Sequence, residues 1–82
     1  MIIKIQERAK KDLKKIDKQN VIKILKNIKK LENYPNISNI KILKNFYPPK
    51  RLRVGDYRIL FDVEGDNVII FNIKHRKEAY EK

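Results

Sequence analysis

The sequence has no cysteine and no tryptophan, and it contains only two glycines and three prolines in 82 residues. Without cysteine it can form neither a disulfide framework nor a metal site built on thiolates. No apolar run approaches the roughly 20 residues needed to cross a bilayer, and the apolar start at residues 1–5 is too short for the hydrophobic part of a signal peptide. We therefore expect a cytoplasmic protein without disulfides.

Several enzyme motifs are also missing. The sequence has no GxxxxGK[ST] phosphate loop, no Gly-x-Ser-x-Gly nucleophile elbow and no zinc-finger spacing. Its aspartates and glutamates do not follow the spacing of a calcium-binding loop, and we interpret most of them as helix caps and turn residues. The sequence therefore predicts no metal site.

Acidic residues are few relative to basic ones, with 10 Asp and Glu against 21 Lys and Arg, which gives a net charge of +11. Such an excess repels itself in a small domain, and we take it to indicate a polyanionic partner. The alternatives are a Lys-rich surface that only maintains solubility, a nucleotide bias, or adaptation to high temperature. An anionic membrane fits less well, because the basic helices carry no Trp or Phe on their apolar faces.

The first half of the chain predicts one strand and two helices. Residues 1–5 are β-branched and predict a strand that is central or pairs early. Residues 8–16 carry a narrow apolar stripe at helical spacing, and Asp17 is a suitable N-cap for a second helix that ends at Tyr34-Pro35. The apolar stripe of this second helix comprises Val21, Ile24, Leu25, Ile28 and Leu31.

The second half predicts a sheet. Residues 36–50 contain an expected edge strand, at Ile40, Ile42 and Leu43, before the rigid turn Tyr47-Pro48-Pro49. Residues 51–73 contain three β-rich runs separated by Gly55-Asp56 and by residues 65–67. A helical turn is expected at 77–81. The predicted fold is α+β: an N-terminal strand and two antiparallel helices on one face of a mainly antiparallel sheet of four or five strands, in a single domain over residues 1–82.

A cluster of arginines is the main candidate site. If Gly55 and Asp56 form a two-residue turn, Arg53 lies opposite Arg58, and Arg51 lies on the same face. Like charges placed opposite each other destabilise a sheet by roughly 0.2–1 kcal/mol, so folding alone would not favour this arrangement. Guanidinium groups match phosphate oxygens in bidentate geometry, which predicts a phosphate site. The alternative is a solvated sheet face, and a slip of one residue in the register would disperse the cluster.

The C-terminal segment is expected to bring Arg76, Tyr80 and His75 towards the same end of the sheet. Tyrosines interleave with basic residues, and since single-stranded bases stack on aromatic rings, this favours RNA over duplex DNA. The candidate catalytic residues are Arg51, Arg53, Arg58, His75, Arg76 and Tyr80. The candidate substrate-binding residues are Lys44, Lys50, Tyr57 and Lys74.

The second half of the chain resembles a known family. The string RLRVGDYRILF, followed at strand spacing by IFNIKHRKEAY, closely resembles the signature of RelE/ParE toxins, in which an R-x-R-x-G-x-Y-R hairpin precedes a final strand and H-R-x-x-x-Y. The segment from Ala9 to Asp17 also fits the first helix of that family. The resemblance covers essentially the whole chain. The hairpin motif is fairly specific to the superfamily, but it is much less specific to one activity within the superfamily.

The resemblance to the RelE branch implies a type II toxin that cuts messenger RNA in the ribosomal A site without metal or cofactor. It implies that the 2′-OH of the messenger attacks the adjacent phosphate and leaves a 2′,3′-cyclic phosphate. Arg53 and Arg58 would bind the phosphate, Arg76 would polarise or help to protonate the leaving oxygen, and Tyr80 would stack on a base. The implied partners are the ribosome with its messenger and an acidic RelB-like antitoxin, in a toxin–antitoxin heterotetramer.

One departure from the family concerns proton transfer. Arg51 and Arg53 stand where some relatives have lysine, and a guanidinium holds its proton too firmly to act as a general base. His75 is an imidazole that could supply this function. Two other functions stay open: a ParE-like poison of DNA gyrase on the same fold, and a basic nucleic-acid-binding module with no activity.

Overall fold

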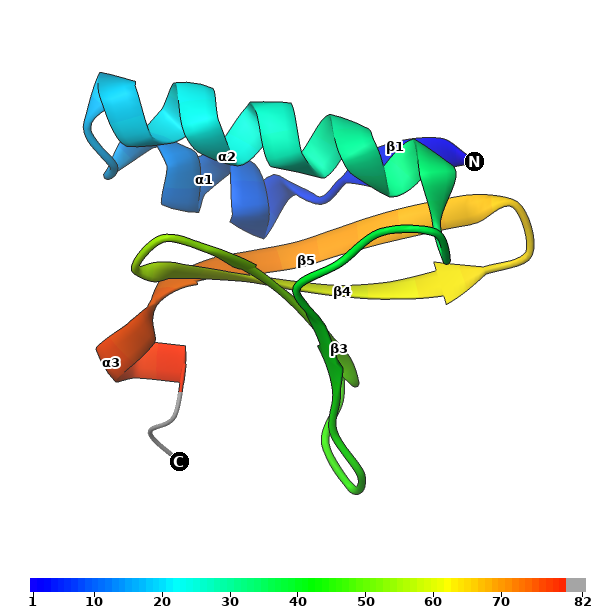
Figure 1. Cartoon of the computed structure of the whole chain (residues 1–82). Helices are drawn as coiled ribbons and strands as arrows, with labels where there is room; N and C mark the ends of the chain where they lie inside the picture. The colour runs from blue at the N-terminus through cyan, green and yellow to red at the C-terminus, as the bar shows by residue number, and fades with distance from the viewer. Residues whose placement is uncertain (80–82) are drawn as a thin grey trace.

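The computed structural model describes residues 1–79, and the side chains of residues 1–77. Five strands form one sheet in the order β1-β5-β4-β3-β2, and two main helices lie on one side of it (Figure 1). The elements in chain order are β1 (Ile2–Ile5), α1 (Glu7–Lys14), α2 (Lys18–Lys30), the 3-10 turn η1 (Leu31–Asn33), β2 (Ile40–Ile42), β3 (Lys50–Val54), β4 (Tyr57–Glu64), β5 (Asn67–His75) and the short α3 (Arg76–Ala79).

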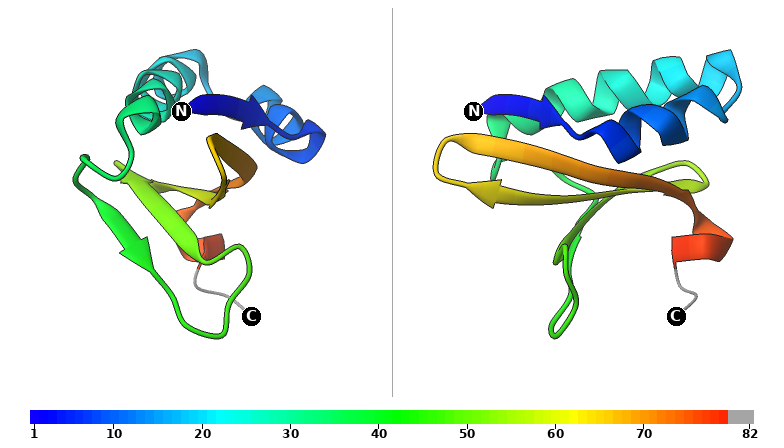
Figure 2. Two further views of the ribbon diagram at one scale, coloured as in Figure 1. Left: turned by 90° about the vertical axis from the view of Figure 1, so that its right-hand side faces the viewer. Right: turned by 180° about the vertical axis from the view of Figure 1, so that it is seen from behind.

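The helices and the sheet form two layers. α1 and α2 lie side by side on one face of the sheet; α1 packs over β5, while α2 lies nearer β3, and the sheet is twisted (Figure 2). All neighbouring strands are antiparallel except β1 and β5, which are parallel. The α+β fold predicted from the sequence is therefore confirmed. No helix within residues 1–79 is both long and apolar enough to span a bilayer.

Local signals set the limits of the two helices. α1 has an acidic residue, Glu7, in its first turn and Lys11 and Lys14 in its last, which complements the helix dipole at both ends. α2 begins after Asp17, whose Oδ2 accepts a hydrogen bond from the Asn20 backbone N–H at 3.4 Å and whose Oδ1 accepts one from Asn20 Nδ2 at 2.6 Å. Asp17 is thus the N-cap that the sequence predicts.

Replacement of this cap gives a first prediction. Asp17→Ala should lower the free energy of unfolding by about 1 kcal/mol, because the first turn of α2 loses a side-chain acceptor. Asp17→Asn keeps an oxygen in the same place and should retain most of the stability. Urea denaturation of the two variants measures the difference, and equal losses would show that the charge, and not the cap, is what matters.

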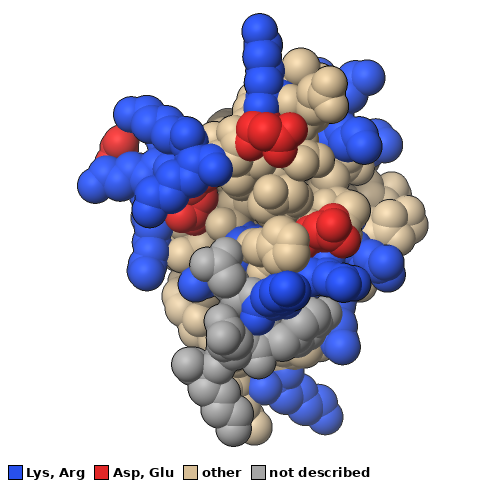
Figure 3. Space-filling view, turned by 90° about the vertical axis from the view of Figure 1, so that its left-hand side faces the viewer, with Lys and Arg blue, Asp and Glu red and all other residues tan. Residues whose placement is uncertain are grey.

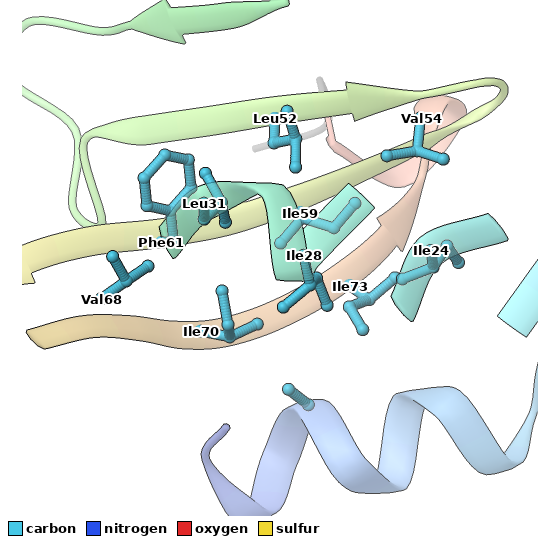
Figure 4. Packing of buried hydrophobic residues seen from close by; sticks show 11 residues of the cluster. Ile24, Ile28, Leu31, Leu52, Val54, Ile59, Phe61, Val68, Ile70 and Ile73 are labelled. Atoms are coloured by element: carbon cyan, nitrogen blue, oxygen red, sulfur yellow. The ribbon is translucent and has the colours of Figure 1, made fainter. Parts of the chain in front are cut away.

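The core lies between the helices and the near face of the sheet (Figure 4). Phe61 on β4 is fully buried and packs edge-on against Tyr34, with ring centroids 6.2 Å apart. Ala9 is the buried residue of α1, where a larger side chain would hold the helix away from the sheet. The other buried members of the cluster are Ile24, Ile28, Leu31, Leu52, Val54, Ile59, Val68, Ile70 and Ile73.

A β-bulge accounts for the irregular pattern of β5. Side chains alternate between the faces of a strand, yet Val68, Ile70 and Ile73 all belong to the same buried cluster. The pairing with β4 shifts between Leu60 and Phe61, which leaves Phe71 as the extra residue on β5. The shift restores contact with the core on both sides of the bulge.

Two sequence-based expectations about the core elements are wrong. β1 is not central: it forms one edge of the sheet, where Ile2 and Lys4 are exposed and only Ile3 and Ile5 are half-buried. Leu25 is exposed, since the apolar stripe of α2 is wider than the face that the helix buries. The expected edge strand is confirmed at the other side of the sheet as β2.

Candidate functional site

The β3–β4 hairpin brings the arginines together as its sequence predicts. Val54 pairs with Tyr57 across the two-residue turn, and Gly55 adopts a left-handed φ of 57°, a conformation that favours glycine. Arg53 therefore lies directly opposite Arg58. Arg51 pairs with Leu60, two residues along β3, and so lies on the same face, which is the one turned away from the helices.

These three arginines line one hollow of about 320 Å³. We call it the arginine hollow; its lining residues are Asn39, Ile40, Lys41, Arg51, Arg53 and Arg58. Lys41 joins the group because it pairs with Arg51 across β2 and β3. Four cationic side chains around a space of this size make a site whose electrostatics favour an anion such as a phosphate.

The three arginines differ in accessibility. Arg53 is exposed, and it forms no ion pair with any residue of the described chain. Arg51 is only 3% exposed, and its Cζ lies 4.4 Å from the centroid of the Phe46 ring. Arg53 is therefore the guanidinium best placed to meet a ligand from solvent, while Arg51 lies deeper in the hollow.

Backbone carbonyls help to hold Arg58 opposite Arg53. Arg58 is 9% exposed, and its Nη1 donates to the Gly55 carbonyl at 3.2 Å and to the Tyr57 carbonyl at 3.1 Å. These bonds to the turn give the buried cation local acceptors and offset part of its repulsion from Arg53. The turn thus fixes both the register and the orientation of one guanidinium group.

Lys50, a predicted substrate-binding residue, is engaged within the protein. Its Nζ lies 3.0 Å from Asp62 Oδ1, and both side chains are only 18% exposed. Asp62 Oδ1 also accepts the Val63 backbone N–H at 2.8 Å. This pair could not be predicted from the hairpin, because Lys50 is opposite Phe61 in its register and not opposite Asp62.

Removal of one member of this pair should destabilise the fold. Asp62→Leu is expected to cost about 1–3 kcal/mol, since it leaves the Lys50 ammonium group largely enclosed without its carboxylate. The double variant Lys50→Met/Asp62→Leu should recover most of that loss in urea denaturation. If the double variant is as unstable as Asp62→Leu, the loss of stability does not come from a Lys50 ammonium group left without its carboxylate.

His75 and Tyr57 lie on the other face of the sheet from the arginines. Tyr57 pairs with His75, and their rings meet edge-on at 5.5 Å, whereas Arg58 pairs with Lys74. Because successive side chains of a strand alternate, the expected approach of His75 and Tyr57 to the arginine cluster does not occur. Both line a second hollow of about 320 Å³, together with Asp12, Lys15, Ile16 and Ile73.

The remaining predicted residues are placed as follows. Lys74 lies on the arginine face beside Arg58, and Lys44 is exposed in the loop between β2 and β3. Arg76 is exposed at the start of α3, where its backbone N–H donates to the Asp56 carbonyl at 2.6 Å and so ties α3 to the hairpin turn. Tyr80 lies outside the described residues.

The sequence did not reveal the parts of the site that come from β2 and its loop. Asn39 and Lys41 come before the loop that joins β2 to β3, and Phe46 lies within it. Because this loop has seven residues, its sequence does not determine the register in which β2 pairs with β3. The aromatic Phe46 two residues before Pro48-Pro49, close to a basic strand, was the available signal. The sequence also assigned no particular role to Asp12, whose Oδ2 accepts the Ile73 backbone N–H at 2.9 Å and joins α1 to β5.

Positive charge dominates the exposed surface beyond the hollow. On the face in Figure 3, which includes grey atoms that are not described, Lys and Arg side chains project at several places and acidic groups are few. No group of three or more His, Asp or Glu side chains among the described residues is arranged to hold a metal ion. The side chains that line the arginine hollow offer fixed cations and hydrogen-bond donors.

Comparisons with known proteins agree with this geometry. The family model for the ParE toxin of the type II toxin–antitoxin system parDE matches residues 3–80. Toxin RelE3 of Methanocaldococcus jannaschii is 42% identical over 41 residues, which span 50% of this chain and 47% of that relative. The activity and partners of the whole relative therefore do not transfer on this match alone.

Solved structures extend the likeness to nearly the whole fold. A RelB–RelE antitoxin–toxin complex from Methanococcus jannaschii contains a chain with 31% identity and a TM-score of 0.78, over 94% of both chains. An archaeal RelE–RelB complex from Pyrococcus horikoshii OT3 gives 24% identity and a TM-score of 0.75, over 92% of this chain and 93% of the other; this second likeness concerns the fold alone. With its arginine-lined hairpin and a family match over nearly its whole length, the chain belongs to the ParE toxin family of type II toxin–antitoxin systems, within the RelE/ParE superfamily.

Proposed function

We propose that this toxin inhibits translation as an endoribonuclease that cleaves messenger RNA on the ribosome. The observation that carries the proposal is the arginine hollow, in which Arg51, Arg53 and Arg58 surround a space open to a phosphate group. Two guanidinium groups directly opposite each other repel, so folding alone does not favour this arrangement. A bound phosphate would offset the repulsion, and the arrangement therefore indicates a site for an anionic ligand. The similarity to toxins named RelE favours RNA as that ligand.

The proposed reaction needs no metal ion or cofactor. The 2′-oxygen of one nucleotide attacks the adjacent phosphorus and loses its proton, the bond from phosphorus to the 5′-oxygen breaks, and that oxygen takes up a proton. The products are a 2′,3′-cyclic phosphate and a free 5′-OH. Charge builds up on the phosphoryl oxygens during attack, and cations fixed in advance around those oxygens lower the barrier.

Each arginine has a proposed role that follows from its accessibility. Arg53, the exposed one, makes first contact with the phosphate and keeps that contact as charge develops in the transition state. Arg58, held by the turn carbonyls, and the deeper Arg51 stabilise the charge that develops in the transition state. Arg76, next to the turn, would polarise or help to protonate the 5′-oxygen, and Tyr80 would stack on or orient a base.

None of the three arginines is suited to accept the proton of the 2′-OH, because a guanidinium stays charged. His75 has the right chemistry, but its contact with Tyr57 places it on the opposite face from the arginines. For it to act on a phosphate in the arginine hollow, the end of β5 would have to rearrange. We therefore propose that catalysis depends mainly on alignment of the substrate's own 2′-OH and on electrostatic stabilisation.

Expression of the toxin in a cell-free translation system tests this proposal. The expected result is arrest of translation, with the messenger cut within codons in the ribosomal A site and with cyclic phosphate ends. Arrest with an intact messenger would contradict it. Double-strand breaks that depend on DNA gyrase, with no messenger cleavage, would assign the protein to gyrase poisoning instead.

The proposed partner in the cytoplasm is a RelB-like antitoxin, since the fold resembles that found in RelB–RelE complexes, and we expect it to be acidic because this chain is strongly basic. A net charge of +11 would speed the electrostatic encounter with such a chain. An amphipathic helix or strand of the antitoxin would wrap the basic sheet and helices, and two toxins with two antitoxins would form a heterotetramer.

A further inference from the structure

Phe46 combines exposure with a contact to the arginine site. The residue is 44% exposed, and the guanidinium of Arg51 lies over its ring, with Cζ 4.4 Å from the ring centroid. Arg51 also lines the arginine hollow. One cation thus joins the hollow to an aromatic ring that still presents surface to solvent.

The loop that carries Phe46 is anchored at both ends and in the middle. The Leu43 backbone N–H donates to the Pro49 carbonyl at 2.8 Å and closes the loop over residues 43–49. The ring of Tyr47 packs edge-on against Phe71, with centroids 5.4 Å apart, and Phe71 is the extra residue of the β5 bulge. Phe46 therefore projects from a loop that is held against the sheet.

Such a ring beside a phosphate site has the chemistry of a nucleobase subsite. Proteins that bind single strands combine a cationic groove for the backbone with aromatic rings on which bases stack, and an arginine next to the ring adds a cation–π contribution. An unpaired base on the exposed part of the Phe46 ring would continue the stack that Arg51 begins. Lys41 and Asn39, which line the hollow, add a charge and an amide nearby.

We propose that Phe46 is the stacking platform of a nucleobase subsite next to the arginine hollow. It would take an unpaired base of any identity, since every base presents a π-face, while the phosphate of the same strand lies in the hollow. This inference depends on one part of the proposed function, namely that a phosphate of the RNA strand binds in the arginine hollow. A protein segment on the same apolar ring is the competing occupant.

Two single-stranded RNAs of equal length and charge test the subsite, one with bases and one abasic. Phe46→Leu should weaken binding of the RNA with bases by about tenfold and leave the abasic strand unaffected. Phe46→Tyr should restore the affinity, because it returns an aromatic face. Thermal unfolding of each variant checks that the loop and the core are intact.

The other outcomes overturn one claim or the other. If Phe46→Leu weakens binding of both RNAs equally, the ring only positions Arg51. If it weakens binding of neither, the exposed ring contacts a protein and not a base. Either result refutes the nucleobase subsite. Arg53→Ala serves as the separate test of the hollow and should weaken both RNAs. If Arg53→Ala changes neither, the proposed function fails, whatever the Phe46 variants do.

Discussion

Arg53→Ala is expected to reduce messenger cleavage by about a hundredfold or more, because it removes the exposed guanidinium of the arginine hollow. Loss of one preorganised donor to a developing oxyanion costs on the order of 10²–10³ in rate. The free energy of unfolding should not fall with it, since the substitution removes one of two like charges that face each other across the hairpin. Rates of cleavage in a translation extract, together with urea denaturation, measure both effects.

Lys26→Ala is the matched control for this variant. Lys26 is exposed on α2, which lies on the other side of the sheet, and its loss lowers the net charge by the same single unit. Cleavage by Lys26→Ala should stay within about twofold of the wild type, given that only the general attraction to RNA changes. Equal losses for the two variants would mean that total charge, and not the hollow, determines activity.

Phe61→Ala should have the largest effect on stability. Phe61 is fully buried on β4 at the centre of the core, where it meets Tyr34 of the segment that leaves α2. Truncation of a buried Phe costs about 3–5 kcal/mol. A chain of 82 residues has a total stability of roughly 4–12 kcal/mol, so the variant should be partly unfolded at 37 °C.

An exposed apolar residue provides the comparison for the core. Ile42→Ala, on the edge strand β2, should change stability by no more than about 0.5 kcal/mol, as Ile42 is 64% exposed. Circular dichroism during urea denaturation gives both values. A cost below about 1 kcal/mol for Phe61→Ala would show that the packing between β4 and the segment after α2 contributes little to the fold.

The sequence predicted the elements that depend on local signals. Asp17 as a cap and Gly55-Asp56 as a two-residue turn need only a few neighbouring residues, and both are confirmed. The position of β1 at the edge was missed because a parallel partner, β5, lies more than 60 residues away and leaves no trace in local periodicity. The bulge at Phe71 was equally hidden, since a change of alternation does not by itself reveal where the extra residue stands.

Only the part of the site that depends on the register of the β3–β4 hairpin could be predicted from the sequence. That register placed Arg53 opposite Arg58 with no knowledge of the rest of the chain. The contribution of β2, the ion pair of Lys50 with Asp62 and the position of His75 depend on contacts between distant segments. His75 shows the limit most clearly: closeness in sequence to Arg76 does not decide which face of the sheet a side chain joins.

Arginine side-chain NMR tests most directly whether the hollow receives RNA phosphate. Short single-stranded RNA with 2′-O-methyl groups cannot be cleaved and can be titrated into the protein while the Nε–H resonances are followed. We predict that Arg51, Arg53 and Arg58 shift at lower RNA concentration than Arg8, which is exposed on α1 outside the hollow. If Arg8 shifts first and the hairpin arginines stay unchanged, RNA binds elsewhere and the arginine hollow is not the phosphate site.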